Sequence, residues 1–186
     1  NGDRPRPTPM LLGHGAAGAG EGLGEGVTDL AKGDHVVLVF VPSCGHCLPC
    51  MEGRPALCET GAASNTAGAL TGGHRRIFRG GDTINHHMGC SAFADHAVVS
   101  RNSLVKVDPE LPLEEAALFG CAVLTGVGAV VNTAKAPMGA TVAVVGLGGV
   151  GLAALLGAVA SGASRIVAVD LARDKRDFAM TLGATD

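Results

Sequence analysis

The feature that most constrains the fold is a glycine-rich turn placed between apolar segments in the last third of the chain. A valine-rich run at 141–145 leads into the turn 146–151, an apolar segment at 152–159 follows it, and a second β-branched run occupies 165–169. This order predicts strand, turn, helix and strand. A crossover that contains a helix is what two parallel strands require.

The turn Gly146-Leu147-Gly148-Gly149-Val150-Gly151 matches the dinucleotide-binding pattern G-x-G-x-x-G. In this pattern Gly146 permits the tight turn, Gly148 lets a pyrophosphate approach the backbone, and Gly151 lets the helix pack closely on the strand. The helix N-terminus then offers free N–H groups and a positive dipole to the phosphates. The hexapeptide alone is weak evidence, but its position between a strand and a helix predicts a dinucleotide site.

Asp170 ends the second predicted strand, nineteen residues after Gly151. A carboxylate at this position can accept hydrogen bonds from a ribose 2′-hydroxyl, and it would repel the 2′-phosphate of NADP. We therefore expect NAD to be the cofactor. The alternative is that Asp170 is an ordinary helix N-cap, a position that aspartate favours.

Four of the six cysteines crowd into a short segment with the spacing Cys44-x2-Cys47-x2-Cys50-x7-Cys58. Four thiolates complete a tetrahedral zinc site and leave no position for a substrate, which predicts a structural Zn2+. An iron–sulfur cluster is the alternative, although the gap of seven residues before Cys58 departs from the ferredoxin spacing. Cys90 has no partner at metal spacing and is expected to be a small buried hydrophobic residue.

Composition excludes several classes of protein. Hydrophobic residues make up 47% of the 186 residues, so a buried core is expected. The net charge of −3 gives no attraction for a phosphate backbone, so nucleic acid is not an expected partner. Arg75, Arg76 and Arg79 are expected to lie in a solvated loop. No apolar run was expected to reach the roughly 20 residues that a membrane span needs.

The remaining segments predict a β-rich first part. We expect β structure over 10–41, an irregular cysteine-rich segment at 42–62, and a loop at 63–85. We expect short strands within 93–107, at 97–99 and 104–107, and a helix over 113–135 that begins after Pro112. A further helix is expected at 174–182, and the boundary between the β-rich and α/β parts near Cys121.

A glycine fingerprint downstream of a four-cysteine loop resembles the zinc-containing medium-chain alcohol dehydrogenases. The long segment between Cys58 and Phe93 is similar to the dimeric liver-type and glutathione-dependent formaldehyde dehydrogenase branch. The stretches that carry the resemblance are Leu12-Gly13-His14, Lys32-Gly33-Asp34-His35-Val36, the cysteine loop, Gly120-Cys121, Thr125-Gly126 and 141–170.

The resemblance implies a two-domain architecture. Residues 1–121 would form an N-terminally truncated GroES-like catalytic domain with a structural-zinc lobe at 42–62. Residues 122–186 would form the first half of a Rossmann domain, a doubly wound parallel sheet. The chain is therefore expected to be an internal fragment that is inactive by itself, from a cytoplasmic homodimer.

The resemblance also implies roles for individual residues. His14 and Cys121 would be two of the three protein ligands of a catalytic zinc, with the third ligand upstream. Gly15 stands where the family has a glutamate near that zinc. Three further assignments carry over: Phe40 in the substrate pocket, Thr125 and Val150 near the nicotinamide, and Lys175 near the adenosine ribose.

The activity implied is hydride transfer between a small alcohol or aldehyde adduct and NAD. Zinc would act as a Lewis acid on the alcohol oxygen, and NAD would carry the redox chemistry. The alternative from another class is a non-catalytic NAD-binding zinc protein that has lost its catalytic metal. Neither nucleic acid nor a membrane is an expected partner.

Overall fold

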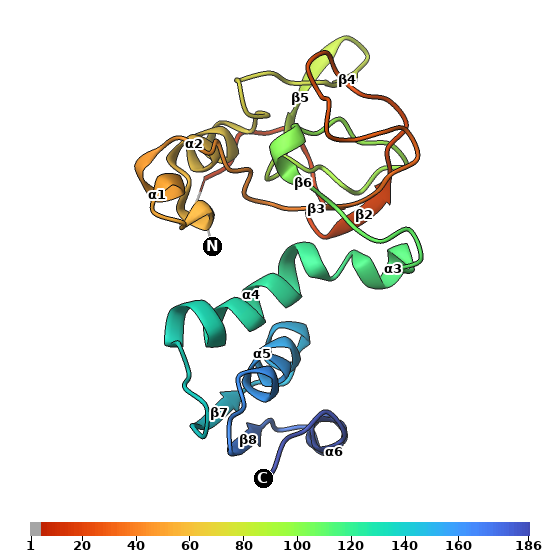
Figure 1. The fold of residues 1–186 in the computed structure, drawn as a ribbon. Helices are drawn as coiled ribbons and strands as arrows, with labels where there is room; N and C mark the ends of the chain where they lie inside the picture. The colour runs from red at the N-terminus through yellow and green to blue at the C-terminus, as the bar shows by residue number, and fades with distance from the viewer. Residues whose placement is uncertain (1–4) are drawn as a thin grey trace. The chain divides into compact units, whose positions relative to one another are not determined.

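The computed structural model describes residues 5–186, which divide into two compact units, the first ending at Gly120 and the second spanning Cys121–Asp186. The first unit is rich in β structure and the second is α/β (Figure 1). Each unit has its own buried residues.

Two three-stranded sheets form the frame of the first unit. One sheet has the order β1-β5-β4, with β1 parallel to β5 and β4 antiparallel to β5. The other has the order β2-β3-β6 and is antiparallel throughout. The strands are β1 (Met10–Leu11), β2 (Ala16–Ala19), β3 (His35–Leu38), β4 (Ile77–Arg79), β5 (Asp82–His86) and β6 (Leu104–Lys106). The central strand β3 buries Val36, Val37 and Leu38, as its apolar run predicts.

The segment between β3 and β5 is more ordered than predicted. It holds α1 (Leu48–Met51), a 3-10 turn η1 (Pro55–Leu57) and α2 (Glu59–Ala67). The predictions of an irregular segment at 42–62 and of a loop from residue 63 were therefore wrong. The loop prediction also missed the β4–β5 hairpin. By contrast, 97–99 forms no strand, although β6 lies where a strand was expected. Arg75 is not simply solvated, because its Nε donates to Asn85 Oδ1 at 2.8 Å.

The second unit contains the predicted strand, turn, helix and strand. β7 (Thr141–Val145) and β8 (Arg165–Val169) are parallel and in register, and α5 (Gly149–Ala160) forms the crossover between them. α6 (Arg173–Thr181) follows, one residue earlier than predicted. The helix α5 begins inside the glycine turn rather than at Leu152. The core gathers Val144, Leu147, Leu155, Ala158 and Ile166.

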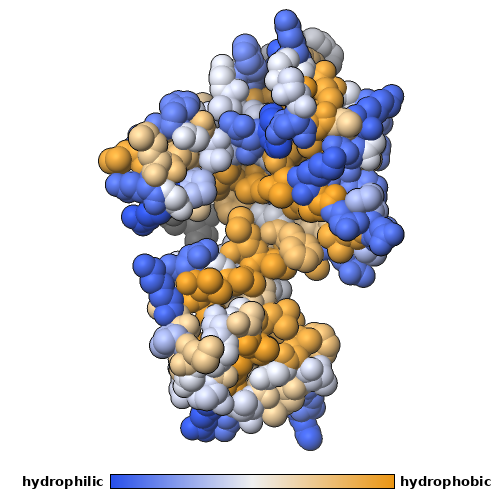
Figure 2. All heavy atoms as spheres, viewed as in Figure 1, coloured by the Kyte–Doolittle hydropathy of each residue, from blue (hydrophilic) through white to orange (hydrophobic). Residues whose placement is uncertain are grey.

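A helix was expected over 113–135, and the structure has a helical stretch over 113–134 whose hydropathy was underestimated. It comprises α3 (Leu113–Ala116), η3 (Phe119–Val123), α4 (Leu124–Gly128) and η4 (Ala129–Ala134), where η3 and η4 are π-helical. This stretch is long and apolar enough to cross a membrane, which corrects the expectation that no such run exists. Core helices of soluble proteins pass the same test, so the finding is weak evidence for a membrane. Figure 2 shows apolar atoms at the surface of the second unit. The exposed large apolar residues of this unit include Leu124, Val131, Val150 and Leu156.

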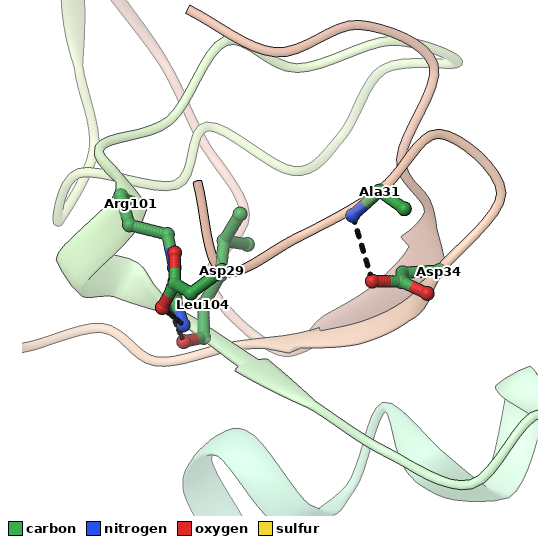
Figure 3. Close-up of polar contacts among 5 residues, drawn as sticks. All are labelled: Asp29, Ala31, Asp34, Arg101 and Leu104. Atoms are coloured by element: carbon green, nitrogen blue, oxygen red, sulfur yellow. Dashed lines mark hydrogen bonds and ion pairs between the residues drawn. The ribbon is translucent and has the colours of Figure 1, made fainter. Parts of the chain in front are cut away.

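In the first unit, a charged contact joins Asp29, which lies in a loop, to Arg101, the first residue of the 3-10 helix η2 (Arg101–Ser103) (Figure 3). The Arg101 guanidinium donates to both carboxylate oxygens of Asp29, with the shortest distance 2.6 Å, and to the Leu104 carbonyl at 2.7 Å. These bonds lower the pKa of Asp29. Nearby, Asp34 accepts a hydrogen bond from the Ala31 N–H at 2.9 Å, which fixes the turn before β3.

Candidate functional site: a cysteine tetrad and a glycine turn

The four clustered cysteines come together in the first unit. Their sulfur atoms all lie within 4.8 Å of one another, and the Cys47 sulfur is 3.5 Å from that of Cys50 and 3.9 Å from that of Cys58. Zn–S bonds of about 2.3 Å in a tetrahedron place sulfurs about 3.8 Å apart. The tetrad therefore fits one tetrahedral ion. A cluster of several irons would hold the sulfurs farther apart, which disfavours the iron–sulfur alternative.

The loop backbone supports the tetrad by donating hydrogen bonds to sulfur. Cys58 Sγ accepts from the Cys44 N–H at 3.2 Å and from the Gly61 N–H at 3.3 Å. Because Cys58 is the N-cap residue of α2, the second bond also caps that helix. A β-carbon at Gly61 would lie 2.1 Å from the Pro42 carbonyl oxygen, so only glycine allows this close approach.

The thiols of the tetrad differ in acidity. A hydrogen bond from the backbone of His46 lowers the pKa of Cys44 to about 5. Burial raises the pKa of Cys50 to about 11, although a hydrogen bond from the Gly45 backbone acts in the opposite direction and lowers it. A bound divalent cation removes this difference, because thiols that coordinate a metal are deprotonated.

Each glycine of the turn has a different physical reason to be glycine. Gly146 has φ of +92°, a conformation that side chains rarely adopt. A β-carbon at Gly151 would lie 1.8 Å from the Gly146 carbonyl oxygen. A β-carbon at Gly148 would meet nothing within 4 Å, so this side of the turn is open. Gly148 is the N-cap of α5 and has no side chain to occupy the helix N–H groups, which suits a phosphate.

Asp170 is hydrogen-bonded to the glycine turn, a contact that was not predicted from the sequence. Its Oδ2 accepts a hydrogen bond from the Leu147 N–H at 2.7 Å, and its Oδ1 accepts from the Ala172 N–H at 2.9 Å. These bonds, the one from Ala172 first, lower the pKa of Asp170 and keep it ionised. Lys175 Nζ lies 3.9 Å from Oδ2. The N-cap of α6 is Ala172, so the N-cap alternative for Asp170 is wrong.

Helix α4 packs tightly on the start of α5. A β-carbon at Gly126 would lie 2.3 Å from the Val150 carbonyl oxygen, so the two helices touch at this glycine. Thr125 precedes Gly126 in α4, and Gly149 and Val150 open α5. The structure thus brings Thr125 to the neighbourhood of the glycine turn, within the second unit.

In the first unit, His14 lies among aromatic rings. Its ring contacts those of Phe40 and His87 edge to face, with centroids 5.8 Å and 5.6 Å away. His87 Nδ1 lies 3.5 Å from the Gly13 carbonyl oxygen, which can only accept, so Nδ1 would donate. His87 was not predicted to lie here, because 74 residues separate it from Gly13. Cys121 opens the second unit.

The turn that carries His14 is held by the segment after β5. The Gly13 carbonyl accepts from the Ala92 N–H at 3.1 Å, and the Leu12 carbonyl accepts from the Phe93 N–H at 3.0 Å. Gly13 has φ of +101°, and a β-carbon there would lie 2.5 Å from the Phe93 nitrogen. At Gly15, in contrast, a β-carbon would meet only the Ala117 carbonyl oxygen at 3.7 Å, an ordinary contact.

A cysteine tetrad that could hold a metal ion lies in a β-rich unit and is followed by an α/β unit with a glycine turn, the arrangement of medium-chain dehydrogenase folds. The model of the alcohol dehydrogenase GroES-like domain matches residues 1–109. The chain belongs to this alcohol dehydrogenase family.

Relatives and solved structures agree with this membership. An alcohol dehydrogenase class-3 of Caenorhabditis elegans is 47% identical over 178 residues, which are 96% of this chain and 46% of that protein. A probable S-(hydroxymethyl)glutathione dehydrogenase 1 of Schizosaccharomyces pombe is 46% identical, over 96% of this chain and 47% of that protein. The structure of an alcohol dehydrogenase zinc-binding domain protein from Burkholderia ambifaria has a TM-score of 0.88 and 39% identity, over 97% of this chain and 49% of that one. The chain spans about half the length of the curated relatives it matches.

Proposed function

We propose that the chain is part of a zinc-dependent alcohol dehydrogenase that transfers hydride between an alcohol, or an aldehyde adduct, and NAD. The proposal depends on one combination: the chain has both a cysteine tetrad of the size that zinc requires and a glycine turn at the start of a helix. This chain is 47% identical to a class-3 alcohol dehydrogenase. In this proposal residues 1–121 belong to the GroES-like catalytic domain, and residues 122–186 begin the Rossmann domain.

The tetrad is the proposed site of a structural zinc. Cys44, Cys47, Cys50 and Cys58 fill the coordination sphere, so this metal orders the loop and takes no part in the reaction. His14 and Cys121 are proposed as ligands of the second, catalytic zinc. When bound, that ion supplies Lewis-acid polarisation of the alcohol oxygen.

The second unit is proposed to bind NAD through the glycine turn. The open side at Gly148 and the uncapped start of α5 would receive the pyrophosphate, and Asp170 and Lys175 would contact the adenosine ribose. Asp170 also holds the turn through the Leu147 N–H. Thr125 and Val150 are proposed to lie against the nicotinamide ring, where they would exclude water from the transferred hydride.

The proposed substrate is a small alcohol or aldehyde. Phe40 beside His14 would give the pocket an apolar wall. The S-(hydroxymethyl)glutathione dehydrogenase among the relatives makes a thiol adduct of formaldehyde one candidate substrate. A homodimer and a cytoplasmic location remain predictions.

The proposal is tested with the complete enzyme that contains this chain. NADH absorbance is followed with a panel of primary alcohols and with formaldehyde plus glutathione, and bound metal is counted by elemental analysis. We expect turnover and two zinc ions per subunit. Turnover should disappear in Cys121→Ala, whereas Cys90→Ala serves as the control cysteine variant. One zinc per subunit with no turnover on any substrate would contradict the proposal and support the non-catalytic alternative.

Cofactor choice gives a separate prediction. We expect Asp170→Gly to weaken NAD binding about 10- to 100-fold, because hydrogen bonds to a charged carboxylate contribute roughly 1.5–3 kcal/mol. NADP binding should change less, since the repulsion of its 2′-phosphate is removed as well. Calorimetric titration of both cofactors measures the two affinities. The matched control is Asp174→Asn, which removes the charge of an acidic residue in the first turn of α6 and should leave both affinities unchanged. Tighter binding of NADP than of NAD by the unmutated protein would show that Asp170 is misassigned.

A further inference from the structure

Helix α2 buries two of its residues, and neither of them offers an apolar side chain. Gly61 and Asn65 lie one helical turn apart, on the face that packs against the segment after β3. Gly61 closely approaches the Pro42 carbonyl, and the Asn65 Nδ2 atom donates to the Phe40 carbonyl at 2.8 Å. Burial of apolar side chains therefore contributes little to this contact, and the bond from Asn65 is the specific interaction that joins the helix to Phe40.

The amide of Asn65 has one possible orientation at this site. The Phe40 carbonyl oxygen can only accept, so the NH2 group faces it and Oδ1 faces away. Oδ1 is buried and has no donor among the described residues. Leucine at this position would also leave one unpaired acceptor, the Phe40 carbonyl, and would bury more apolar surface. The advantage of asparagine is therefore a fixed position for Phe40 rather than greater stability.

Phe40 lies just beyond the sheet, where the ladder no longer holds the backbone. Strand β3 pairs with β2 and β6 as far as its last residue, and the Val39 N–H still donates to the Ser103 carbonyl at 2.7 Å. One residue further along, Asn65 donates to the Phe40 carbonyl. Since the direction of a side chain follows that of its backbone, this bond also fixes the Phe40 ring against that of His14, with 5.8 Å between the centroids.

We propose that Asn65 is a positioning residue for the substrate pocket, and that its hydrogen bond to Phe40 sets the size of the alcohol that the pocket accepts. The inference rests on the proposed function, in which Phe40 is an apolar wall of the pocket and His14 is a ligand of the catalytic zinc. A ring held at a fixed distance from His14 limits the room for the alkyl chain. A ring whose backbone is released can turn away, which admits longer alcohols and orients short ones less well.

Two further contacts hold the helix that presents Asn65. Cys58 Sγ caps its N-terminus through the Gly61 N–H at 3.3 Å, and Arg6 Nη1 donates to the Asn65 carbonyl at 2.6 Å. The backbone of Asn65 is thus held independently of its side chain. Removal of the side-chain amide alone is therefore expected to release Phe40 while the helix stays in place.

The complete enzyme tests the proposal with Asn65→Leu, which removes the donor at similar side-chain volume. We expect the ratio of kcat/KM for ethanol to that for hexan-1-ol to fall about 5-fold or more, with the KM for NAD unchanged. A crystal structure of the variant should show the Phe40 ring displaced from His14. Arg6→Leu is the matched control, because it removes the other hydrogen bond to Asn65 and leaves the one to Phe40. The control should change neither the ratio nor the position of the ring.

A double-mutant cycle with Phe40→Ala separates positioning from a general loosening of the fold. If Asn65 acts through Phe40, Asn65→Leu should leave the ratio nearly unchanged once the ring is absent, whereas a structural role would give the same change in both backgrounds. A Phe40 ring that stays in place in Asn65→Leu, or an unchanged ratio, overturns the proposal. Loss of tetrad zinc from this variant also overturns it, because the helix then fails as a whole. An unmutated enzyme that oxidises no alcohol would overturn the proposed function, and the ring position in the variant would still decide whether Asn65 places Phe40.

Discussion

Cys58→Ser is expected to abolish zinc binding at the tetrad and to unfold the surrounding loop. Cys58 is the one fully buried tetrad cysteine, and its sulfur also caps α2 through the Gly61 N–H. Structural zinc sites contribute on the order of 10 kcal/mol of binding free energy, which is also folding free energy for the segment that the metal orders. Elemental analysis should show the loss of one zinc per chain, and amide hydrogen exchange should show loss of protection across α1 and α2.

Cys90→Ser is the matched control for this change. Cys90 is equally buried but lies outside the tetrad, and burial raises its pKa to about 12, so it remains a neutral thiol. Its sulfur contacts the Val39 carbonyl at 3.7 Å, a contact that a serine hydroxyl can replace. The control should keep its zinc. Equal metal loss in both variants, or bound iron in the unmutated protein, would contradict the assignment of the tetrad.

Gly151→Ala is expected to disrupt the nucleotide site and to destabilise the second unit by about 3 kcal/mol or more. The added β-carbon would lie 1.8 Å from the Gly146 carbonyl oxygen and 2.9 Å from its carbonyl carbon. Because both neighbours are backbone atoms, relief requires α5 to move away from the turn that precedes it. Denaturant unfolding measures the loss of stability, and calorimetric titration should detect no binding of NAD.

The control for this prediction is Gly128→Ala, also a glycine in a helix. A β-carbon there would meet only Asn132 Nδ2, at 3.8 Å, so the substitution should be neutral or slightly stabilising. Normal NAD binding by Gly151→Ala would mean that the glycine turn does not hold the pyrophosphate.

The second unit could be predicted almost residue by residue, because its signals are local. The strands at 141–145 and 165–169 are rich in β-branched residues, and the glycines between β7 and α5 predict the turn. An apolar run such as 141–145 also predicts a buried strand, but in β7 Val144 is the one buried residue and Val145 is 81% exposed. Periodicity cannot tell which face of a short apolar strand is covered.

The first unit was harder because its order depends on contacts that are distant in sequence. Helix α2 mixes good helix formers, glutamate and alanine, with glycine, serine, threonine and asparagine, which are poorer ones, and its cap is a cysteine sulfur. One local signal was available and overlooked. Gly80 and Gly81 both have positive φ and join β4 to β5, the two-residue glycine turn typical of a hairpin.

The candidate site was predictable where spacing alone defines it and not where side chains meet across the fold. The tetrad followed from four cysteines in one loop. The aromatic contacts of His14 with His87 depend on the pairing of β1 with β5, for which the sequence gives no register. The bond between Asp170 and the Leu147 N–H likewise depends on the adjacent ends of β7 and β8.

That bond limits how the cofactor preference of this protein can be redesigned. The Asp170 carboxylate accepts hydrogen bonds from the Leu147 and Ala172 N–H groups. A residue without a side-chain oxygen, chosen only to avoid repulsion of a 2′-phosphate, would therefore leave both donors without an acceptor. An NADP-accepting design should therefore restore an oxygen at position 170 while it removes the charge. Serine removes the charge and offers an acceptor to one of the two donors, whereas glycine or alanine removes the charge and offers no acceptor. A change of cofactor preference at position 170 must therefore first keep an acceptor for the N–H groups of the turn and then remove the negative charge.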